Sequence, residues 1–274
     1  MSHIILDVKN LSVQYNHPKY QKQIVHDVSF SVKAGKCLGI LGESGSGKSM
    51  TTKAILGTLN KEFSIGGSAC FEGKELLSMN DNELRSFRGS DIGMILQNPM
   101  TCFDPLYKIG NQIYETFDAH GLYPKQEYKD RALTILQKMR IHDPHEVLEK
   151  FPHQLSGGML QRVMIGIAMS MNPKLLICDE PTTAIDSITQ YKVLNEFKRI
   201  KAEGQVGMLF ITHDVSVISH IADEIIVLNQ GRLVDSGYFK DILENAKDPY
   251  TKLLFEKKLA ISVHYKSILH QGRA

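Results

Sequence analysis

The first part of the chain is dominated by strand-like patterns of apolar residues. Apolar and polar residues alternate between Ile5 and Val13, which predicts a strand. A second strand is predicted from Val28 to Val32, and the polar stretch 16–23, which contains Pro18, is expected to form a loop. The continuous apolar run from Cys37 to Leu41 predicts a strand that is buried on both faces.

Helical and strand-like patterns alternate through the rest of the chain. Helices are predicted at Met50–Leu59, at Ile188–Glu203 and, with breaks, over Pro99–Met171. Further strands are predicted in a stretch ending near Leu77 and at Ile92–Leu96, Lys174–Cys178, Val206–Thr212 and Glu224–Leu228. Because strands alternate with helices at this spacing, we expect an α/β fold whose parallel sheet is covered by helices on both faces.

The predicted elements divide the chain into three parts. Residues 1–98 and 161–240 are expected to form a core that carries a β subdomain. Residues 99–160 are expected to form an inserted helical subdomain, and residues 241–274 a short C-terminal extension. Within that extension, the pattern from Lys257 to Tyr265 predicts a final amphipathic helix.

The composition is that of an ordinary globular protein, and it argues against several classes of function. The formal net charge of the 274 residues is only +2, so the basic excess that favours nucleic-acid binding is absent. No apolar run approaches the ~18 residues of a membrane-spanning helix, and the N-terminus does not resemble a secretory signal. The cysteines are scattered, which argues against a zinc site or a disulfide framework and fits a reducing cytosol.

A glycine-rich segment lies between the predicted strand 37–41 and the helix that follows it. It matches the pattern G-x-x-x-x-G-K-[ST] in full. In such a loop, backbone amides and the helix N-terminus surround phosphate oxygens, the lysine reaches the β- and γ-phosphates, and the serine hydroxyl coordinates Mg²⁺. The residues expected to bind ATP are Gly42, Glu43, Ser44, Gly45, Ser46, Gly47, Lys48, Ser49, which also serves as a Mg²⁺ ligand, and Met50.

Two acidic residues follow the predicted strand 174–178. Because ligands bind at the C-terminal ends of strands in open α/β sheets, Asp179 and Glu180 are placed close to a bound nucleotide. We expect Asp179 to hold Mg²⁺, directly or through water, and Glu180 to polarise the attacking water. Beside a complete phosphate loop, this interpretation is preferred to two solvated acids at a strand end.

The segment from Leu155 to Arg162 reads LSGGMLQR. It resembles the LSGGQ-type signature of ABC transporter ATPases, with Met159 in place of the usual glutamine. The resemblance extends over residues 4–256 and implies a P-loop NTPase fold with a RecA-like core, an antiparallel β subdomain and an inserted helical subdomain. It also implies a head-to-tail dimer, in which Ser156, Gly157 and Gly158 act on the ATP held by the partner's phosphate loop.

Other motifs resemble those of the same family and follow in the expected order. Gln97 resembles the Q-loop glutamine, which implies contact with Mg²⁺ and the attacking water at the border to the membrane partner. Asp186 resembles the D-loop aspartate, and His213 resembles the switch histidine that contacts the γ-phosphate. Tyr15 resembles the aromatic residue that stacks on adenine; an ordinary surface or core tyrosine is the alternative.

Several stretches resemble the importers of peptides and nickel more than other ABC ATPases. They include residues 97–101, QNPMT, and residues 248–252, DPYTK, in which Asp248 replaces the histidine of a His-Pro-Tyr-Thr segment. The resemblance implies a second, non-identical ATPase subunit, two transmembrane permease subunits and an extracytoplasmic substrate-binding protein. It also places the chain on the cytoplasmic face of a bacterial cell membrane, with no nucleic-acid partner.

Two features favour the import of nickel or a related transition metal, as an ion or a small chelate. Residues 245–274 contain no cysteine, whereas peptide importers often carry a cysteine cluster there. Leu160, which is expected on the surface of a helix, stands where peptide importers more often have arginine.

Several alternatives compete with a metal importer. An importer of dipeptides or oligopeptides fits the same motifs, and an exporter stays open because the direction of transport is not readable from these residues. A soluble ABC protein of DNA repair or translation usually carries two cassettes or a long coiled-coil insert, which 274 residues do not accommodate. A non-hydrolytic scaffold is disfavoured by the intact set Lys48, Asp179, Glu180 and His213.

Overall fold

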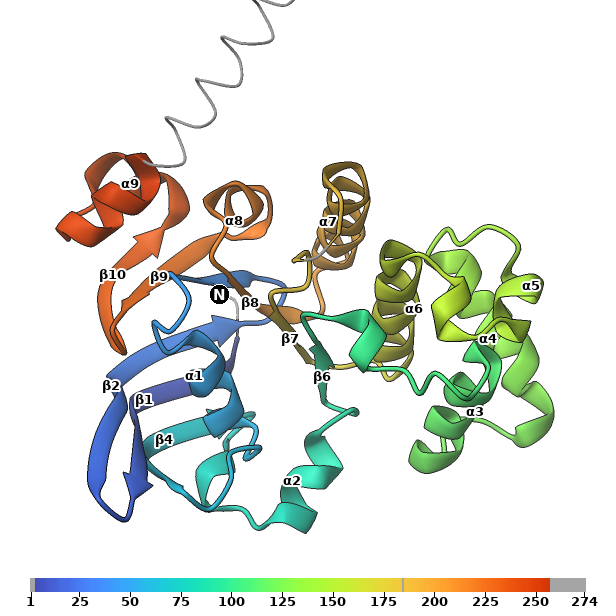
Figure 1. Ribbon diagram of the computed structural model, residues 1–274, viewed down its shortest axis with the longest axis horizontal. Coiled ribbons are helices and arrows are strands. Elements are labelled where there is room, and N and C mark those ends of the chain that lie inside the picture. Colours follow the sequence, from blue (N-terminus) through green and yellow to red (C-terminus); the bar gives the residue numbers. More distant parts are fainter. Residues whose placement is uncertain (1–2, 184, 257–274) are drawn as a thin grey trace, which may run out of the picture.

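The computed structural model describes residues 3–183 and 185–256, and it contains two sheets and a group of helices (Figure 1). The strands are β1 Ile4–His17, β2 Tyr20–Lys33, β3 Cys37–Leu41, β4 Phe63–Phe71, β5 Lys74–Glu75, β6 Ile92–Ile95, β7 Leu175–Asp179, β8 Gly207–Thr212, β9 Glu224–Asn229 and β10 Arg232–Tyr238. The α-helices are α1 Lys48–Ile55, α2 Asp81–Phe87, α3 Ile109–His120, α4 Tyr128–Lys138, α5 Pro144–Glu149, α6 Gly157–Ser170, α7 Ser187–Ala202, α8 Val215–Ile221 and α9 Phe239–Asn245. Short 3₁₀ helices lie at Leu76–Ser78, Pro99–Thr101, Lys125–Glu127 and Pro152–Gln154. The helix predicted at 257–265 lies outside the described residues.

The central sheet has the strand order β10-β9-β3-β8-β7-β6. The pairs β3–β8, β3–β9, β7–β8 and β6–β7 are parallel, and only β10 is antiparallel to its neighbour in this sheet. β3 lies at the centre, and all of its residues are buried, as its unbroken apolar run predicts. The parallel arrangement places the C-terminal ends of β3, β7 and β8 at one edge, which confirms the predicted α/β fold.

The second sheet is antiparallel and has the order β2-β1-β4-β5. The predicted loop at 16–23 is wrong, because β1 and β2 continue through it and only residues 18–19 form a turn. His17 pairs with Tyr20, and Tyr15 pairs with Lys22, so the backbone ladder extends to the tip of the hairpin. Polar side chains do not prevent this pairing, because an antiparallel ladder is held by backbone hydrogen bonds and one face can meet water.

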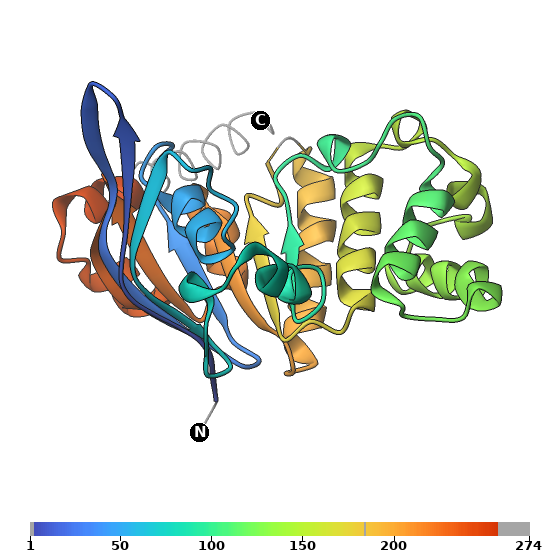
Figure 2. The same cartoon turned by 90° about the horizontal axis from the view of Figure 1, so that it is seen from below.

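Two hydrophobic cores cover the two faces of the central sheet. One is shared with α1 and the antiparallel sheet, and the other with the helices that extend to the right in Figure 2. Leu160 belongs to the second core and is fully buried, so its expected position on a helix surface is wrong. The predicted division at residue 160 stays a prediction, and it falls inside the continuous helix α6.

The first helix of the core begins and ends earlier than predicted. α1 starts at Lys48, within the glycine-rich segment, and stops at Ile55. Gly57 has φ +61°, and its backbone N–H donates to the carbonyl of Ala54, which closes the last turn. A glycine in the left-handed region is a common helix terminator, and it ends α1 before Leu59. In the described part of the chain, no helix is long and apolar enough to cross a membrane.

Candidate nucleotide-binding site

The glycine-rich segment connects β3 to α1 at the C-terminal edge of the central sheet. Gly47 caps α1 with φ 101°, a backbone conformation that favours glycine. The tip of the loop, residues 43–45, is exposed, whereas Ser46 and Lys48 are each only 5% exposed. The Oγ atom of Ser46 is buried and has no hydrogen-bond partner among the described residues. Together, the exposed tip and the unpaired hydroxyl fit a loop that receives phosphate oxygens.

The Lys48 ammonium group lies inside this loop. It donates hydrogen bonds to the carbonyl oxygens of Gly42, at 2.8 Å, and Glu43, at 3.0 Å. Burial lowers the pKa of Lys48, and the nearby Glu180 and Asp179 carboxylates oppose that shift. The loop therefore holds a buried cation through its own carbonyls, at the position where a phosphate would supply the opposing charge.

Ser49 and Asp179 come together from α1 and β7. The Ser49 hydroxyl donates to Asp179 Oδ1 over 3.2 Å. Burial raises the pKa of Asp179, while this hydrogen bond and the Lys48 charge lower it. A hydroxyl and a carboxylate side by side are oxygen ligands of the kind that Mg²⁺ prefers, so the residues present fit this cation.

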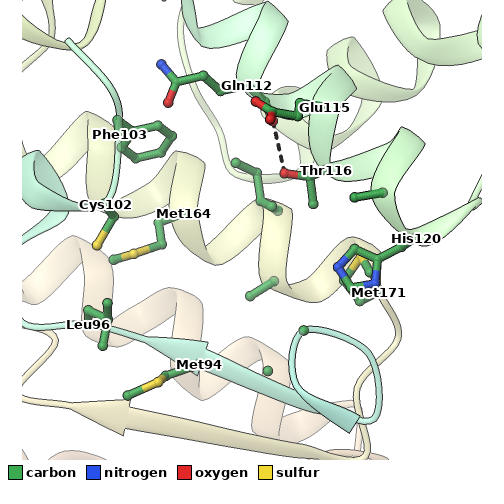
Figure 3. Close-up of a pocket in the computed structure, with 15 residues that line it drawn as sticks. Met94, Leu96, Cys102, Phe103, Gln112, Glu115, Thr116, His120, Met164 and Met171 are labelled. Atoms are coloured by element: carbon green, nitrogen blue, oxygen red, sulfur yellow. Dashed lines mark hydrogen bonds between the residues drawn. The ribbon is translucent and has the colours of Figure 1, made fainter. Parts of the chain in front are cut away.

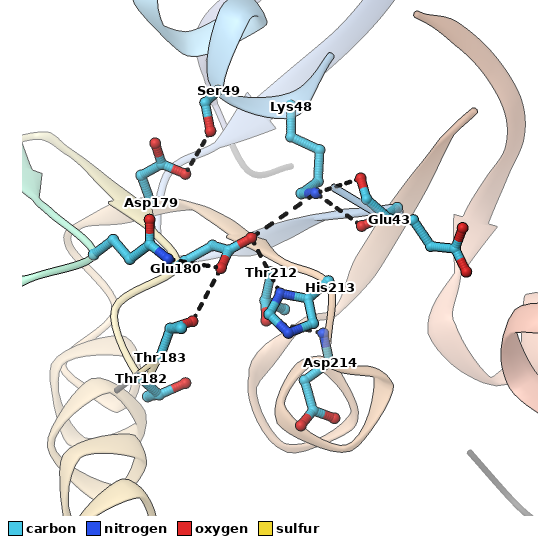
Figure 4. A network of polar contacts seen from close by, with 12 residues as sticks. Glu43, Lys48, Ser49, Asp179, Glu180, Thr182, Thr183, Thr212, His213 and Asp214 are labelled. Carbon is cyan, nitrogen blue, oxygen red and sulfur yellow. Dashed lines mark hydrogen bonds and ion pairs between the residues drawn. The ribbon is translucent and has the colours of Figure 1, made fainter. Parts of the chain in front are cut away.

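Glu180 is the centre of a polar network formed with three other segments and with Thr183 on its own turn (Figure 4). Its Oε1 atom lies 3.1 Å from His213 Nδ1 and 3.9 Å from Lys48 Nζ. Its Oε2 atom accepts hydrogen bonds from Gln97 Nε2, at 3.4 Å, and Thr183 Oγ1, at 3.0 Å. The structure thus brings together Gln97, Glu180 and His213, which the sequence predicts for this site.

The backbone of Glu180 adopts a left-handed conformation with φ 47°. Its N–H donates to the carbonyl of Ile211 on β8, and its own carbonyl accepts from the N–H of Thr183. A glutamate in this region is uncommon and is held there by surrounding structure. The two backbone hydrogen bonds turn the chain sharply after β7 and direct the carboxylate toward the phosphate loop (Figure 4).

Thr183 is a further residue of this network, and no sequence motif indicates it. Its hydroxyl donates to the same carboxylate oxygen as Gln97 does, so it fixes one side of Glu180. The one feature of the sequence that could indicate this contact is a hydroxyl three residues after the glutamate, where the chain turns after a predicted strand. That signal depends on the left-handed turn at Glu180, which the sequence pattern does not predict.

The predicted signature and D-loop residues lie at the starts of two neighbouring helices. The Ser156 side chain caps α6 by accepting from Met159 N, and the Asp186 side chain caps α7 by accepting from Ile188 N and Thr189 N. A side-chain hydrogen bond with Thr189, together with these backbone hydrogen bonds, lowers the pKa of Asp186. No hydrogen bond among the described residues joins Ser156, Gly157, Gly158 or Asp186 to the phosphate loop.

Tyr15 lies on β1 within a cluster of aromatic rings. Its ring centroid is 5.1 Å from that of Phe63 and 6.1 Å from that of Tyr20. In the described part of the chain, no hydrogen bond or ring contact connects Tyr15 to the phosphate loop. The ring is half-buried, and its predicted stacking on adenine stays a prediction.

A groove of about 520 Å³ opens beside the segment that carries Gln97 (Figure 3). Its walls come from β6 and the residues that follow it, from α3 and from α6. Most of the lining side chains are apolar, including Leu96, Phe103 and Met164, and the polar Gln112, Glu115 and His120 lie on the α3 side. The groove contains no residue of the phosphate loop, but Leu96, which lines it, directly precedes Gln97, which contacts Glu180.

Comparison with known proteins identifies the family. Residues 25–183 match the family model described as "ABC transporter", and the chain belongs to this family. It is an ATP-binding and ATP-hydrolysing subunit of that family, which confirms the resemblance inferred from the motifs.

Relatives of known function and a solved structure agree with this assignment. The chain is 39% identical to the metal-staphylopine import system ATP-binding protein CntD of Staphylococcus aureus, over 97% of both chains. It is 41% identical to the oligopeptide transport ATP-binding protein OppD of Lactococcus lactis, over 91% of this chain and 74% of that protein. The dimeric ATP-binding cassette MJ0796, solved in a post-hydrolysis state with ADP and phosphate, matches with a TM-score of 0.74 and 26% identity, over 85% of this chain and 98% of that one.

Proposed function

We propose that this chain energises the uptake of a transition metal, as an ion or a small chelate, by hydrolysing ATP at the site around Glu180. The observation that carries the enzymatic part is the Glu180 carboxylate, whose four side-chain neighbours include the lysine of the phosphate loop. The proposal for the cargo is supported by the 39% identity to a metal-staphylopine importer ATPase over 97% of both chains.

Glu180 acts on water in this proposal. Phosphoryl transfer needs mainly positioning and charge stabilisation, and a carboxylate orients the attacking water. Gln97, Thr183 and His213 hold that carboxylate in place, and Lys48, held by its loop carbonyls, reaches the β- and γ-phosphates. His213 is 46% exposed at the side chain, so it is accessible to the γ-phosphate.

Mg²⁺ would be held by Ser49 and Asp179, with Gln97 at the same side of the site. When bound, the cation neutralises charge on the phosphate oxygens. The Ser49–Asp179 hydrogen bond would be replaced by contacts to the cation. Tyr15 would stack on adenine from β1.

The signature segment serves the partner's site. Ser156, Gly157 and Gly158 lie at the start of α6, whose N-terminal end suits an anion. Because nothing in this chain's described residues supplies that anion, we infer that the phosphate comes from ATP on a second ATPase subunit, which is a non-identical relative. Asp186 lies next to this segment at the start of α7 and belongs to the same interface.

The groove beside Gln97 suits a permease subunit. Leu96, which lines the groove, is 39% exposed, and Met100, four residues later, is 44% exposed, so apolar surface is available to a partner here. A permease segment that occupies the groove would touch the same stretch of chain that carries Gln97. Two permease subunits and an extracytoplasmic substrate-binding protein complete the proposed importer, with this chain on the cytoplasmic face of a bacterial membrane.

A peptide importer is the second candidate. The 41% identity to OppD over 91% of this chain supports it, and the phosphate loop is equally suited to either cargo. The cargo need not touch this subunit, so the geometry of the ATP site does not discriminate between the two.

The direct experiment is deletion of the gene, with return of either the wild-type gene or Glu180→Gln. Cellular nickel, cobalt and zinc are measured by mass spectrometry during growth on metal-limited medium, and growth on dipeptides and oligopeptides is measured in parallel. We expect the deletion and Glu180→Gln strains to lose at least one metal, and wild type to restore it. Normal metal content with lost growth on peptides would replace the metal cargo by peptides and leave the ATPase in place.

A further inference from the structure

The segment 248–252 resembles a motif of the importers of peptides and nickel, but none of its residues belongs to the polar network around Glu180. In the structure, residues 249–256 are helical, and Asp248 caps this helix. Its Oδ1 atom accepts from Tyr250 N at 2.8 Å, and its carbonyl accepts from Lys252 N at 3.2 Å. Aspartate is among the preferred capping residues, and proline is favoured in the first turn, so Asp248-Pro249 fixes where this helix begins.

The start of this helix is anchored to the central sheet by Asp235. This carboxylate on β10 is 5% exposed and accepts from the backbone N–H groups of Lys247, at 3.2 Å, and Asp248, at 3.0 Å. Asp235 pairs with Val227 on β9, and Val227 pairs with Leu41 on β3. Leu41 directly precedes the phosphate loop. Asp235 is therefore connected to the start of this loop by one row of paired residues across three strands.

Tyr250 connects the C-terminal helix to the phosphate loop. Its hydroxyl oxygen accepts a hydrogen bond from the backbone N–H of Glu43 over 2.8 Å. The same peptide unit carries the Gly42 carbonyl, which accepts from Lys48 Nζ at 2.8 Å. One peptide plane of the phosphate loop is therefore held by the loop's lysine through its oxygen and by the C-terminal segment through its nitrogen.

We propose that Tyr250 is a positioning residue for ATP binding, because it fixes the Gly42–Glu43 peptide that orients Lys48. The proposal rests on the proposed ATP site. Without the tyrosine hydroxyl, this peptide loses the hydrogen bond that holds its nitrogen, so the Gly42 carbonyl is a less firmly fixed partner for Lys48. Part of the binding free energy is then used to order the loop when the phosphates arrive. The expected effect lies in ATP affinity rather than in the chemical step.

The test is Tyr250→Phe in the assembled transporter, with ATP binding followed by a fluorescent analogue and steady-state hydrolysis measured alongside. The ring packs against the second core and is retained, so only the hydroxyl is removed. Loss of one ordinary hydrogen bond predicts a KM and an analogue Kd raised by about threefold to tenfold, with kcat unchanged. Tyr238→Phe, at a 61% exposed tyrosine of β10, is the matched control and should change neither constant.

A second pair of variants approaches the same contact from the helix cap. Asp248→Ala removes the acceptor that orders Tyr250, so it should reproduce the rise in KM, and Asp248→Asn should restore wild-type affinity because asparagine caps equally well. Unchanged affinity in Tyr250→Phe overturns the proposal while wild-type hydrolysis keeps the ATP site intact. A fall in kcat that parallels a lower melting temperature, with KM unchanged, also overturns it, since that pattern indicates packing alone.

Discussion

The phosphate-loop region and the signature region differ in how their polar groups are satisfied. Lys48 and Ser49 at the start of α1 contact Glu180 and Asp179 at the end of β7, and Glu180 also contacts His213 after β8. Ser156 and Asp186 instead use their oxygens to cap their own helices, and the described residues provide no bond from them to the first region. One region is assembled by the fold of a single chain, whereas the other, among the described residues, has no such partner and is the region for which we propose contact with a second subunit.

The largest expected effect tests the phosphate-loop region. Glu180→Gln keeps the size of the side chain but removes the charge that polarises water, so steady-state hydrolysis should fall at least ~10²-fold. ATP binding should survive, because Lys48 and the loop amides remain. Glu244→Gln, at an exposed position on α9, is the control. Hydrolysis at a near wild-type rate in the assembled transporter would show that Glu180 is wrongly assigned.

The second prediction tests how the signature segment is positioned. A Cβ added at Gly158 would lie 1.9 Å from Thr189 Cγ2, a contact that forces the starts of α6 and α7 apart. Gly158→Ala should therefore lower the free energy of unfolding by about 1–3 kcal/mol, as overpacked substitutions do. Urea unfolding monitored by circular dichroism is the measurement.

A compensating change separates packing from function at the same residue. Thr189→Ser removes Cγ2, so the nearest remaining atom is Cβ at 3.3 Å. The double variant Gly158→Ala/Thr189→Ser should regain most of the lost stability, and the single Thr189→Ser change should cost little. If stability stays low in the double variant, the contact with Thr189 is not the cause.

The smallest expected effect tests the signature region. Ser156→Ala loses the helix cap, at about 1 kcal/mol, and in the proposed dimer it also loses a hydroxyl that faces the partner's ATP. In a defined heterodimer, vanadate trapping should decrease at the site whose phosphate loop belongs to the partner. Ser156→Asp keeps a cap acceptor but adds a charge that repels phosphate, so it should lose trapping there with stability retained. Loss confined to this chain's own phosphate loop would contradict the head-to-tail dimer.

Much of this site was predictable because its motifs are local. The phosphate loop, the acids after β7 and the order of strands and helices follow from short patterns whose chemistry restricts the residues at each position. The ends of elements were less predictable: α1 stops at a glycine turn, and the hairpin of β1 and β2 continues through residues that look like a loop. Leu160 was misplaced because the helix that carries it is enclosed by neighbours on the side expected to face solvent.

The contacts that refine the site were not predictable from such patterns. The left-handed backbone of Glu180 results from a hydrogen bond to Ile211, and it brings Thr183 onto the carboxylate. The bond between Tyr250 and Glu43 joins positions 207 residues apart. Such contacts depend on how the sheet assembles, and a single sequence contains no periodic signal for them.

Helix α6 has a mechanical consequence. It is one continuous helix of 14 residues, and at 1.5 Å per residue it is about 21 Å long. Gly157 stands at its first turn, whereas Met164, Ile167 and Ala168 line the groove beside β6. A partner that displaces the groove-lining half of α6 would therefore also move the N-terminal end of the same helix, which carries the signature segment. A few degrees of tilt at one end become a displacement at the other, without any need for the residues between them to rearrange.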